Sequence, residues 1–162
     1  MARVLIISAT RGNNLDLSHK ISELLSCEKK IVVLEDFSMP VYNPDLETSD
    51  FSNIKILCQD FIDSDGLIFC APEYNGGSPP ILTNTITWLS VSTSNWRDAF
   101  LNKKALIATH SGGAGFRFLS TFRIQLEHLG TIVYPRNIII NRSQAFNKES
   151  SQKILKGFLD LI

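Results

Sequence analysis

Residues 66–90 read GLIFCAPEYNGGSPPILTNTITWLS and contain the clearest indication of the fold in this chain. It opens with an unbroken apolar run, residues 66–71, which favours a strand buried on both faces of a parallel sheet. A loop rich in turn-forming residues follows, from Pro72 to Gly77. Ser78 is suited to cap the next helix, and the two prolines after it fit the first helical turn. The stretch therefore predicts a loop at the carboxyl end of a central strand, which is where open α/β sheets bind ligands.

Strand-like and helix-like segments alternate along the rest of the chain. This alternation predicts right-handed crossovers and a parallel sheet with helices on both faces, in an α/β fold. The length suits a single domain over residues 1–162. We expect five strands, at residues 4–7, 31–34, 66–71, 105–109 and 131–134, with residues 137–140 as a candidate extension of an edge. Helices are expected at residues 15–25, 51–62, 78–90, 118–129 and 148–162.

The composition excludes several classes of protein. Hydrophobic residues make up 44% of the chain and charged residues 20%, which is typical of neither a disordered nor a fibrous protein. The 16 Lys and Arg residues balance 16 Asp and Glu residues, which argues against a general nucleic-acid binder. No apolar run is long enough to span a membrane. The chain passes from Met1 straight into a strand pattern, so we expect no cleavable signal. Three scattered cysteines without a Cys-x-x-Cys pair favour the reducing cytoplasm.

A polar loop, residues 8–14, follows the first expected strand and precedes a helix. Ser8 and Thr10 supply hydroxyl groups, Arg11 supplies a positive charge, and the helix start supplies free N–H groups. The loop contains neither Gly-x-Gly-x-x-Gly nor the Walker pattern, so neither a dinucleotide fingerprint nor a P-loop is indicated. A hydroxyl-rich loop of this kind suits a terminal monophosphate, although polar loops after strands are common.

A second loop, residues 110–115, follows the fourth expected strand and contains three glycines, which let the backbone approach a planar ligand closely. His110 and Ser111 could be read as a base and a nucleophile. Adjacent residues at a strand end usually point to opposite sides, however, and the Gly-x-Ser-x-Gly elbow is absent. The three histidines also lack metal-ligand spacing. A ligand-binding loop is therefore favoured over a hydrolase or a metal centre.

Residues 72–76, Pro-Glu-Tyr-Asn-Gly, and the helix that follows as far as Trp88 closely resemble the flavin loop of the NADPH-dependent FMN reductase family. That family is flavodoxin-like and includes quinone, azo-dye and chromate reductases. The resemblance covers nearly the whole chain and implies a three-layer sandwich with a five-stranded parallel sheet in the order 2-1-3-4-5. The first loop departs from the family's pattern, because Ala9 replaces a glycine and Thr10 a serine. The other candidate phosphate partners there are Asn13, Asn14 and Ser18.

The resemblance implies an oxidoreductase in which FMN carries the chemistry and no side chain is catalytic. NADPH or NADH would pass hydride to the flavin, which would then reduce a quinone, an azo compound or a free flavin. The FMN phosphate is expected over residues 8–14, and the ring between residues 72–77 and 110–115. The expected cofactor-binding residues are Ser8, Thr10, Arg11, Asn13, Asn14, Pro72, Glu73, Tyr74, Asn75, Gly76, His110, Ser111, Gly112 and Gly113.

The two tryptophans bear on whether the protein forms oligomers. Trp88 and Trp96 suit either the core or a subunit contact, and the resemblance favours a homodimer or a homotetramer. The main rival function is a flavin-binding redox sensor or partner-binding module with little turnover. A third alternative is the same fold without flavin. Reduction of the flavin by NADPH distinguishes an enzyme from a sensor.

Overall fold

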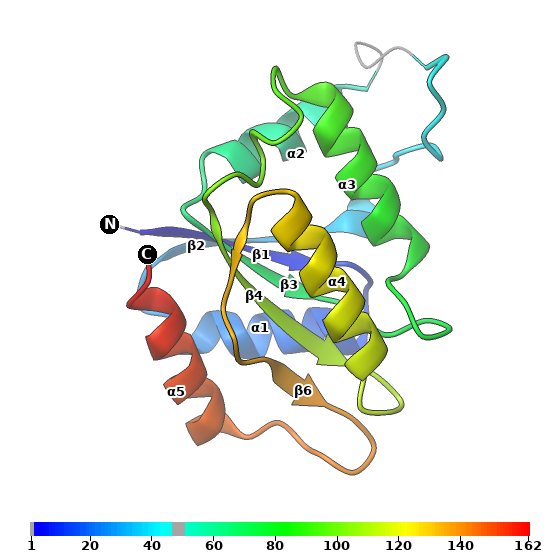
Figure 1. Ribbon diagram of the computed structural model, residues 1–162. Helices are drawn as coiled ribbons and strands as arrows, with labels where there is room; N and C mark the ends of the chain where they lie inside the picture. Colours follow the sequence, from blue (N-terminus) through cyan, green and yellow to red (C-terminus); the bar gives the residue numbers. More distant parts are fainter. Residues whose placement is uncertain (1, 47–50) are drawn as a thin grey trace.

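The computed structural model describes residues 2–46 and 51–162 and contains a parallel β-sheet (Figure 1). Met1, which entered the expectation of no cleavable signal, lies outside these residues. The central strands run in the order β2-β1-β3-β4-β5, as expected for a flavodoxin-like fold. The strands are β1 (Arg3–Ser8), β2 (Glu28–Val33), β3 (Gly66–Cys70), β4 (Lys104–His110), β5 (Ile132–Val133) and β6 (Ile138–Ile140).

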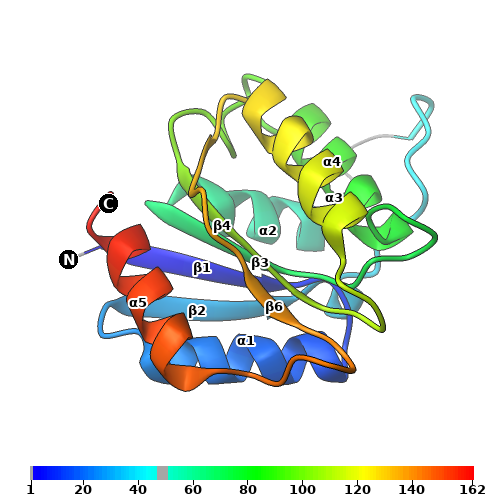
Figure 2. The ribbon, with the colours of Figure 1, turned by 60° about the horizontal axis from the view of Figure 1, so that its bottom comes forward.

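Helices cover both faces of the sheet and complete the expected three layers (Figures 1 and 2). One face is covered by α1 (Asn13–Leu24) and α5 (Lys148–Leu159), and the other by α2 (Ser52–Ile62), α3 (Pro80–Ser92) and α4 (Phe116–His128). A short 3-10 helix, η1 (Leu34–Asp36), follows β2. Successive residues of a strand point to opposite faces. In β1, Val4 therefore packs in the core on the α1 side and Leu5 in the core on the α3 side.

Two short strands share the place beside β4. The start of β4 pairs with β5, and its end pairs with β6 from Ala108 to His110. The strand expected at residues 131–134 is thus reduced to two residues, whereas the candidate extension at residues 137–140 is confirmed as β6. Tyr134 N–H still donates to the carbonyl of Ala105 at 2.7 Å, and the register then shifts by two residues, from Lys104 opposite Ile132 to Ala108 opposite Ile138. Because β6 is parallel to β4, the residues after β6 emerge at the carboxyl end of the sheet.

The start of α3 differs from the expectation in one detail. Ser78 was expected to cap this helix, but the N-cap position is Pro79, and no side chain caps the helix. Pro79 is extended, with φ −61° and ψ 143°, because a residue that precedes a proline avoids the helical region. The expectation of a proline in the first turn holds for Pro80, at the start of α3.

Trp88 belongs to the core. Its side chain is fully buried, and its Nε1–H donates a hydrogen bond of 2.8 Å to the carbonyl of Pro40. The rings of Tyr42 and Phe51 pack edge-on against it. Trp88 therefore holds the 37–44 connection onto α3 and offers no surface to a second subunit. Trp96, in contrast, is 44% exposed.

The described part of the chain includes no helix that is both long and apolar enough to cross a bilayer.

Candidate active site

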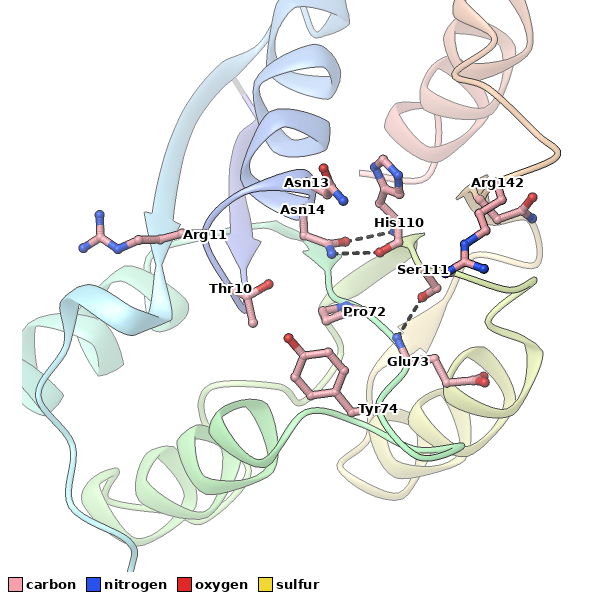
Figure 3. A pocket seen from close by; sticks show the side chains of 12 residues that line it. Thr10, Arg11, Asn13, Asn14, Pro72, Glu73, Tyr74, His110, Ser111 and Arg142 are labelled. Carbon is pink, nitrogen blue, oxygen red and sulfur yellow. Dashed lines mark hydrogen bonds between the residues drawn. The ribbon is translucent and has the colours of Figure 1, made fainter.

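A polar pocket of about 430 Å³ lies at the carboxyl ends of β1, β3, β4 and β6 (Figure 3). This volume falls within the usual range of small-molecule sites. Three loops that are far apart in sequence contribute, and the turn after β6 adds a fourth side. The lining residues are Thr10, Arg11, Asn13, Asn14, Pro72, Glu73, Tyr74, His110, Ser111, Gly112, Asn141 and Arg142.

The pocket brings together ten of the residues expected to bind the cofactor, in each of the three predicted loops. Four expected residues do not line it. Ser8 is buried, and its hydroxyl donates to the carbonyl of Thr10 at 2.8 Å. Asn75 and Gly76 form a tight turn in which both have positive φ, at 50° and 77°. Gly113 is exposed beyond the rim.

Asn14 joins two sides of the pocket. Its side chain is 3% exposed, and its Nδ2 donates to the carbonyl of His110 at 3.0 Å. Its Oδ1 accepts from the backbone N–H of the same residue at 2.9 Å. These bonds tie the start of α1, which follows β1, to the end of β4. In the sheet, β3 lies between β1 and β4. The Asn14 amide thus binds protein backbone on both of its polar atoms.

Arg11 points away from the other lining residues (Figure 3). Its guanidinium forms an ion pair with Asp36 of η1, and its backbone N–H donates to the Glu35 carboxylate. The Arg11 side chain is 64% exposed. Its expected contact with a phosphate therefore stays a prediction, and it requires the guanidinium to turn from Asp36 toward the pocket.

The amino end of α1 has the features of a phosphate site. Gly12 occupies the N-cap position with φ 66°, and no side chain caps the helix. The first N–H groups of a helix have no partner within the helix, and together with the helix dipole they attract anions. Thr10 and Asn13 add a hydroxyl and an amide to the same end of the pocket.

The other end of the pocket is a slot between two loops that are bonded to each other. The backbone N–H of Glu73 donates to Ser111 Oγ at 2.8 Å, and Ser111 Oγ lies 2.8 Å from Thr109 Oγ1. The Glu73 carboxylate accepts from the N–H of Phe118 at 3.0 Å, at the amino end of α4. Tyr74 is 49% exposed, and its phenol oxygen points toward Thr10 (Figure 3).

Neither thiol nor metal chemistry is indicated. Cys70 lies just before the loop at residues 72–76, but its side chain is fully buried, and this burial raises the pKa of its thiol to about 12. Nowhere in residues 2–46 and 51–162 do three or more metal-ligating side chains cluster.

Comparison with known proteins decides the family. Residues 2–145 match the family model described as NADPH-dependent FMN reductase. The chain belongs to this family. It is accordingly an NAD(P)H-dependent oxidoreductase with FMN as its cofactor. The residues present fit that cofactor, because the uncapped start of α1 suits its phosphate and the loops after β3 and β4 offer backbone groups to its ring.

Two named relatives are identical to this chain at about a quarter of the aligned positions. The chain is 27% identical to a 2-hydroxy-1,4-benzoquinone reductase of Burkholderia sp. over 145 residues, which cover 87% of this chain and 74% of the relative. It is 27% identical to an NADPH azoreductase of Bacillus sp. (strain OY1-2) over 105 residues, which cover 64% and 56% of the two chains.

Solved structures confirm the fold. The flavoenzyme NAD(P)H:(acceptor) oxidoreductase FerB of Paracoccus denitrificans superposes with a TM-score of 0.83 at 20% identity, covering 99% of this chain and 97% of that chain. A flavodoxin from the domain Archaea has a TM-score of 0.63 at 10% identity, covering 99% and 97%.

Sequence reasoning missed Asn141 and Arg142. Both residues line the pocket because β6 pairs with the end of β4 and delivers them to the rim. A signal for them was present. Residues 137–140 were a candidate edge extension, and the residues after a parallel strand at that edge reach the same end of the sheet.

Proposed function

We propose that this protein transfers electrons from NADPH or NADH, through FMN held in the pocket, to a quinone or a similar small acceptor. The observation that supports the proposal is the convergence of three loops on one polar pocket that includes the uncapped start of α1. Hydride acceptance and electron transfer are chemistry that FMN supplies when bound. The protein supplies binding, orientation and a charge environment.

The FMN phosphate is proposed to lie at the start of α1, against Thr10, Asn13 and the free N–H groups of the first turn. The ring is proposed to lie between Pro72–Tyr74 and His110–Gly112. Asn14 and Ser111 act as positioning residues in this arrangement, because Asn14 ties the start of α1 to His110 and Ser111 ties Glu73 to the loop after β4. No side chain needs to act as a nucleophile.

A quinone or an azo compound is the proposed class of acceptor, and a free flavin is a further member of it. The names of the two relatives support the proposal, since one is a benzoquinone reductase and the other an azoreductase. The pocket supports it as well, because its polar rim is open to small molecules. Association as a homodimer or homotetramer is a further proposal. It is supported by the exposed side chains of Trp96, Leu101 and Ile132, and the particle mass from light scattering tests it.

An anaerobic absorbance experiment tests the function. Protein loaded with FMN is mixed with one equivalent of NADPH, and the flavin absorbance is followed before and after a quinone is added. We expect NADPH to bleach the flavin and the quinone to restore its colour, and we expect the cycle to repeat each time a further equivalent of NADPH and of quinone is added. A flavin that NADPH leaves oxidised, or that turns over only once, would instead favour the sensor.

A further inference from the structure

Arg142 is held at the pocket rim by a closed turn. In the pairing of β6 with β4, Ile140 lies opposite His110, and the Ser111 N–H donates to the Ile140 carbonyl at 3.1 Å. Asn141 and Gln144 then exchange backbone hydrogen bonds of 3.0 and 3.2 Å. The Asn141 side chain closes the turn from within. Its Oδ1 accepts from the N–H and the hydroxyl of Ser143, both at 2.9 Å. Arg142 stands between these residues, so its backbone position is fixed relative to the slot.

Three charged side chains line the pocket, and two of them already have partners. Arg11 pairs with Asp36, and the Glu73 carboxylate accepts from Phe118 N–H at the start of α4. Arg142 forms no ion pair with any carboxylate in the part of the chain that the structure describes. Of the two lining arginines, Arg142 is therefore the one without a carboxylate partner among the described residues, and the Glu73 carboxylate of the same lining has no cationic partner there either.

Arg142 also lies across the pocket from Thr10, one of the residues proposed to bind the phosphate. Figure 3 shows it beside the His110–Gly112 loop, whereas Arg11 lies on the opposite side. A Cβ placed on Gly112 would come 4.0 Å from Arg142 Nε. Since Gly112 has no side chain, the space between the guanidinium and the slot stays open. An anionic group of a ligand stacked over the slot can therefore reach Arg142.

We propose that Arg142 binds the anionic group of the second ligand, the one that enters the pocket after FMN. A guanidinium presents a planar fork of donors that suits phosphate, carboxylate and ionised phenolic oxygens. Two sources share this chemistry, namely a phosphate of the nucleotide donor and the ionised oxygen of an acidic acceptor. The proposal rests on the proposed function, and it makes Arg142 a specificity-determining residue for that reaction.

The test is a binding experiment on the oxidised protein loaded with FMN. Benzoate and benzamide are the probes for the acceptor, because they share a shape and differ in charge. NADP⁺ is the probe for the donor. Each is titrated against the wild type, Arg142→Gln and Arg142→Lys, and the change in flavin absorbance gives the Kd. Arg136→Gln is the matched control, because Arg136 is exposed and does not line the pocket, so this substitution removes the same charge at another place.

We expect Arg142→Gln to weaken benzoate, NADP⁺ or both by about tenfold, which converts to ~1.4 kcal/mol, and to leave benzamide unchanged. Arg142→Lys should restore part of the lost affinity. Added salt should weaken binding of the anion to the wild type more than to Arg142→Gln. A loss for benzoate alone identifies the acceptor as the source of the anion. A loss for NADP⁺ alone identifies the donor.

Several results would overturn the assignment of Arg142. These are unchanged affinity for both anions, an equal loss for benzoate and benzamide, and an equal loss in Arg136→Gln. Weaker binding of FMN itself would also overturn it, because Arg142 would then contact the cofactor. The FMN titration of the wild type is performed first. Failure at that step refutes the proposed function and the Arg142 proposal with it, whereas normal FMN binding followed by any result above refutes the Arg142 proposal alone.

Discussion

Replacement of Asn14 by alanine tests whether this residue is part of the scaffold or a phosphate ligand. The Asn14 amide makes two hydrogen bonds to the backbone of His110, at 3.0 and 2.9 Å, from a side chain that is 3% exposed. Each such bond contributes about 0.5–1.5 kcal/mol net. Because the freed His110 groups border the pocket and gain some water, we expect the free energy of unfolding to fall by about 2 kcal/mol.

Urea unfolding followed by circular dichroism measures this loss. With a denaturant slope of about 2 kcal/mol/M, the midpoint should fall by about 1 M. Asn13→Ala is the matched control. Asn13 is the neighbouring residue in α1, it is exposed, and its side chain makes no hydrogen bond among the described residues. Both variants gain the same helix propensity from alanine, so the difference between their midpoints isolates the His110 contact.

Ligand binding provides a second measurement on the same variant. If Asn14 positions the loop after β4, Asn14→Ala should weaken FMN and riboflavin by similar factors, because the loop contacts the ring that they share. If Asn14 binds the phosphate, only FMN should weaken. A midpoint equal to that of Asn13→Ala, or a loss confined to FMN, would refute the scaffold role.

Three other predictions follow from the pocket and the core. Arg11→Ala should weaken FMN by about tenfold in fluorescence titrations and leave riboflavin unchanged, since a charged hydrogen bond contributes ~1.5–3 kcal/mol; an equal loss for both ligands would show that Arg11 does not bind the phosphate. Cys58 and Cys70 should resist thiol reagents in the native protein near pH 8, because burial raises the pKa of Cys58 to about 11 and that of Cys70 to about 12, and the thiolate is the reactive form. Rapid labelling of the native protein would contradict this burial. Because the unfolded thiols lose their protons near pH 9.0 and the buried thiols only at higher pH, the free energy of unfolding should also fall as the pH rises above 9.0. Steady-state rates with NADPH and a quinone should give parallel double-reciprocal lines, since donor and acceptor share one pocket, whereas intersecting lines would indicate a ternary complex.

Much of the fold could be predicted because its signals are local. The run at residues 66–71 has no alternation, as a strand covered on both faces requires, and β3 is buried along its length. The same holds for β1 and β4, whose loops define the pocket. The brevity of β5 could not be predicted, because residues 131–134 have the pattern of a longer strand and only Ile132 and Val133 pair with β4.

The individual contacts of the site depend on directions that the sequence does not encode. Asn13 and Asn14 are identical neighbours, yet only Asn14 turns inward to His110, because the helix places successive residues about 100° apart. Arg11 was expected to face a phosphate, but the carboxylates that follow β2 lie close enough to pair with it. Trp88 and Trp96 were equally plausible as core or surface, and only the packing of the 37–44 connection separates them.

A titration of FMN fluorescence on three proteins tests whether FMN binds in this pocket. The proteins are the wild type, Gly112→Phe and Gly113→Phe. Gly112 lines the pocket and Gly113 does not, and a Cβ at either position meets nothing closer than 4.0 Å. Neither Cβ would therefore clash, and because only residue 112 lies on the pocket lining, we expect only its phenylalanine ring to compete with FMN for space. We expect the wild type and Gly113→Phe to quench FMN with similar Kd values, and Gly112→Phe to bind at least about tenfold more weakly, a difference of ~1.4 kcal/mol. Absence of quenching by the wild type at high micromolar FMN, or equal affinity of the two phenylalanine variants, would contradict binding of FMN in this pocket.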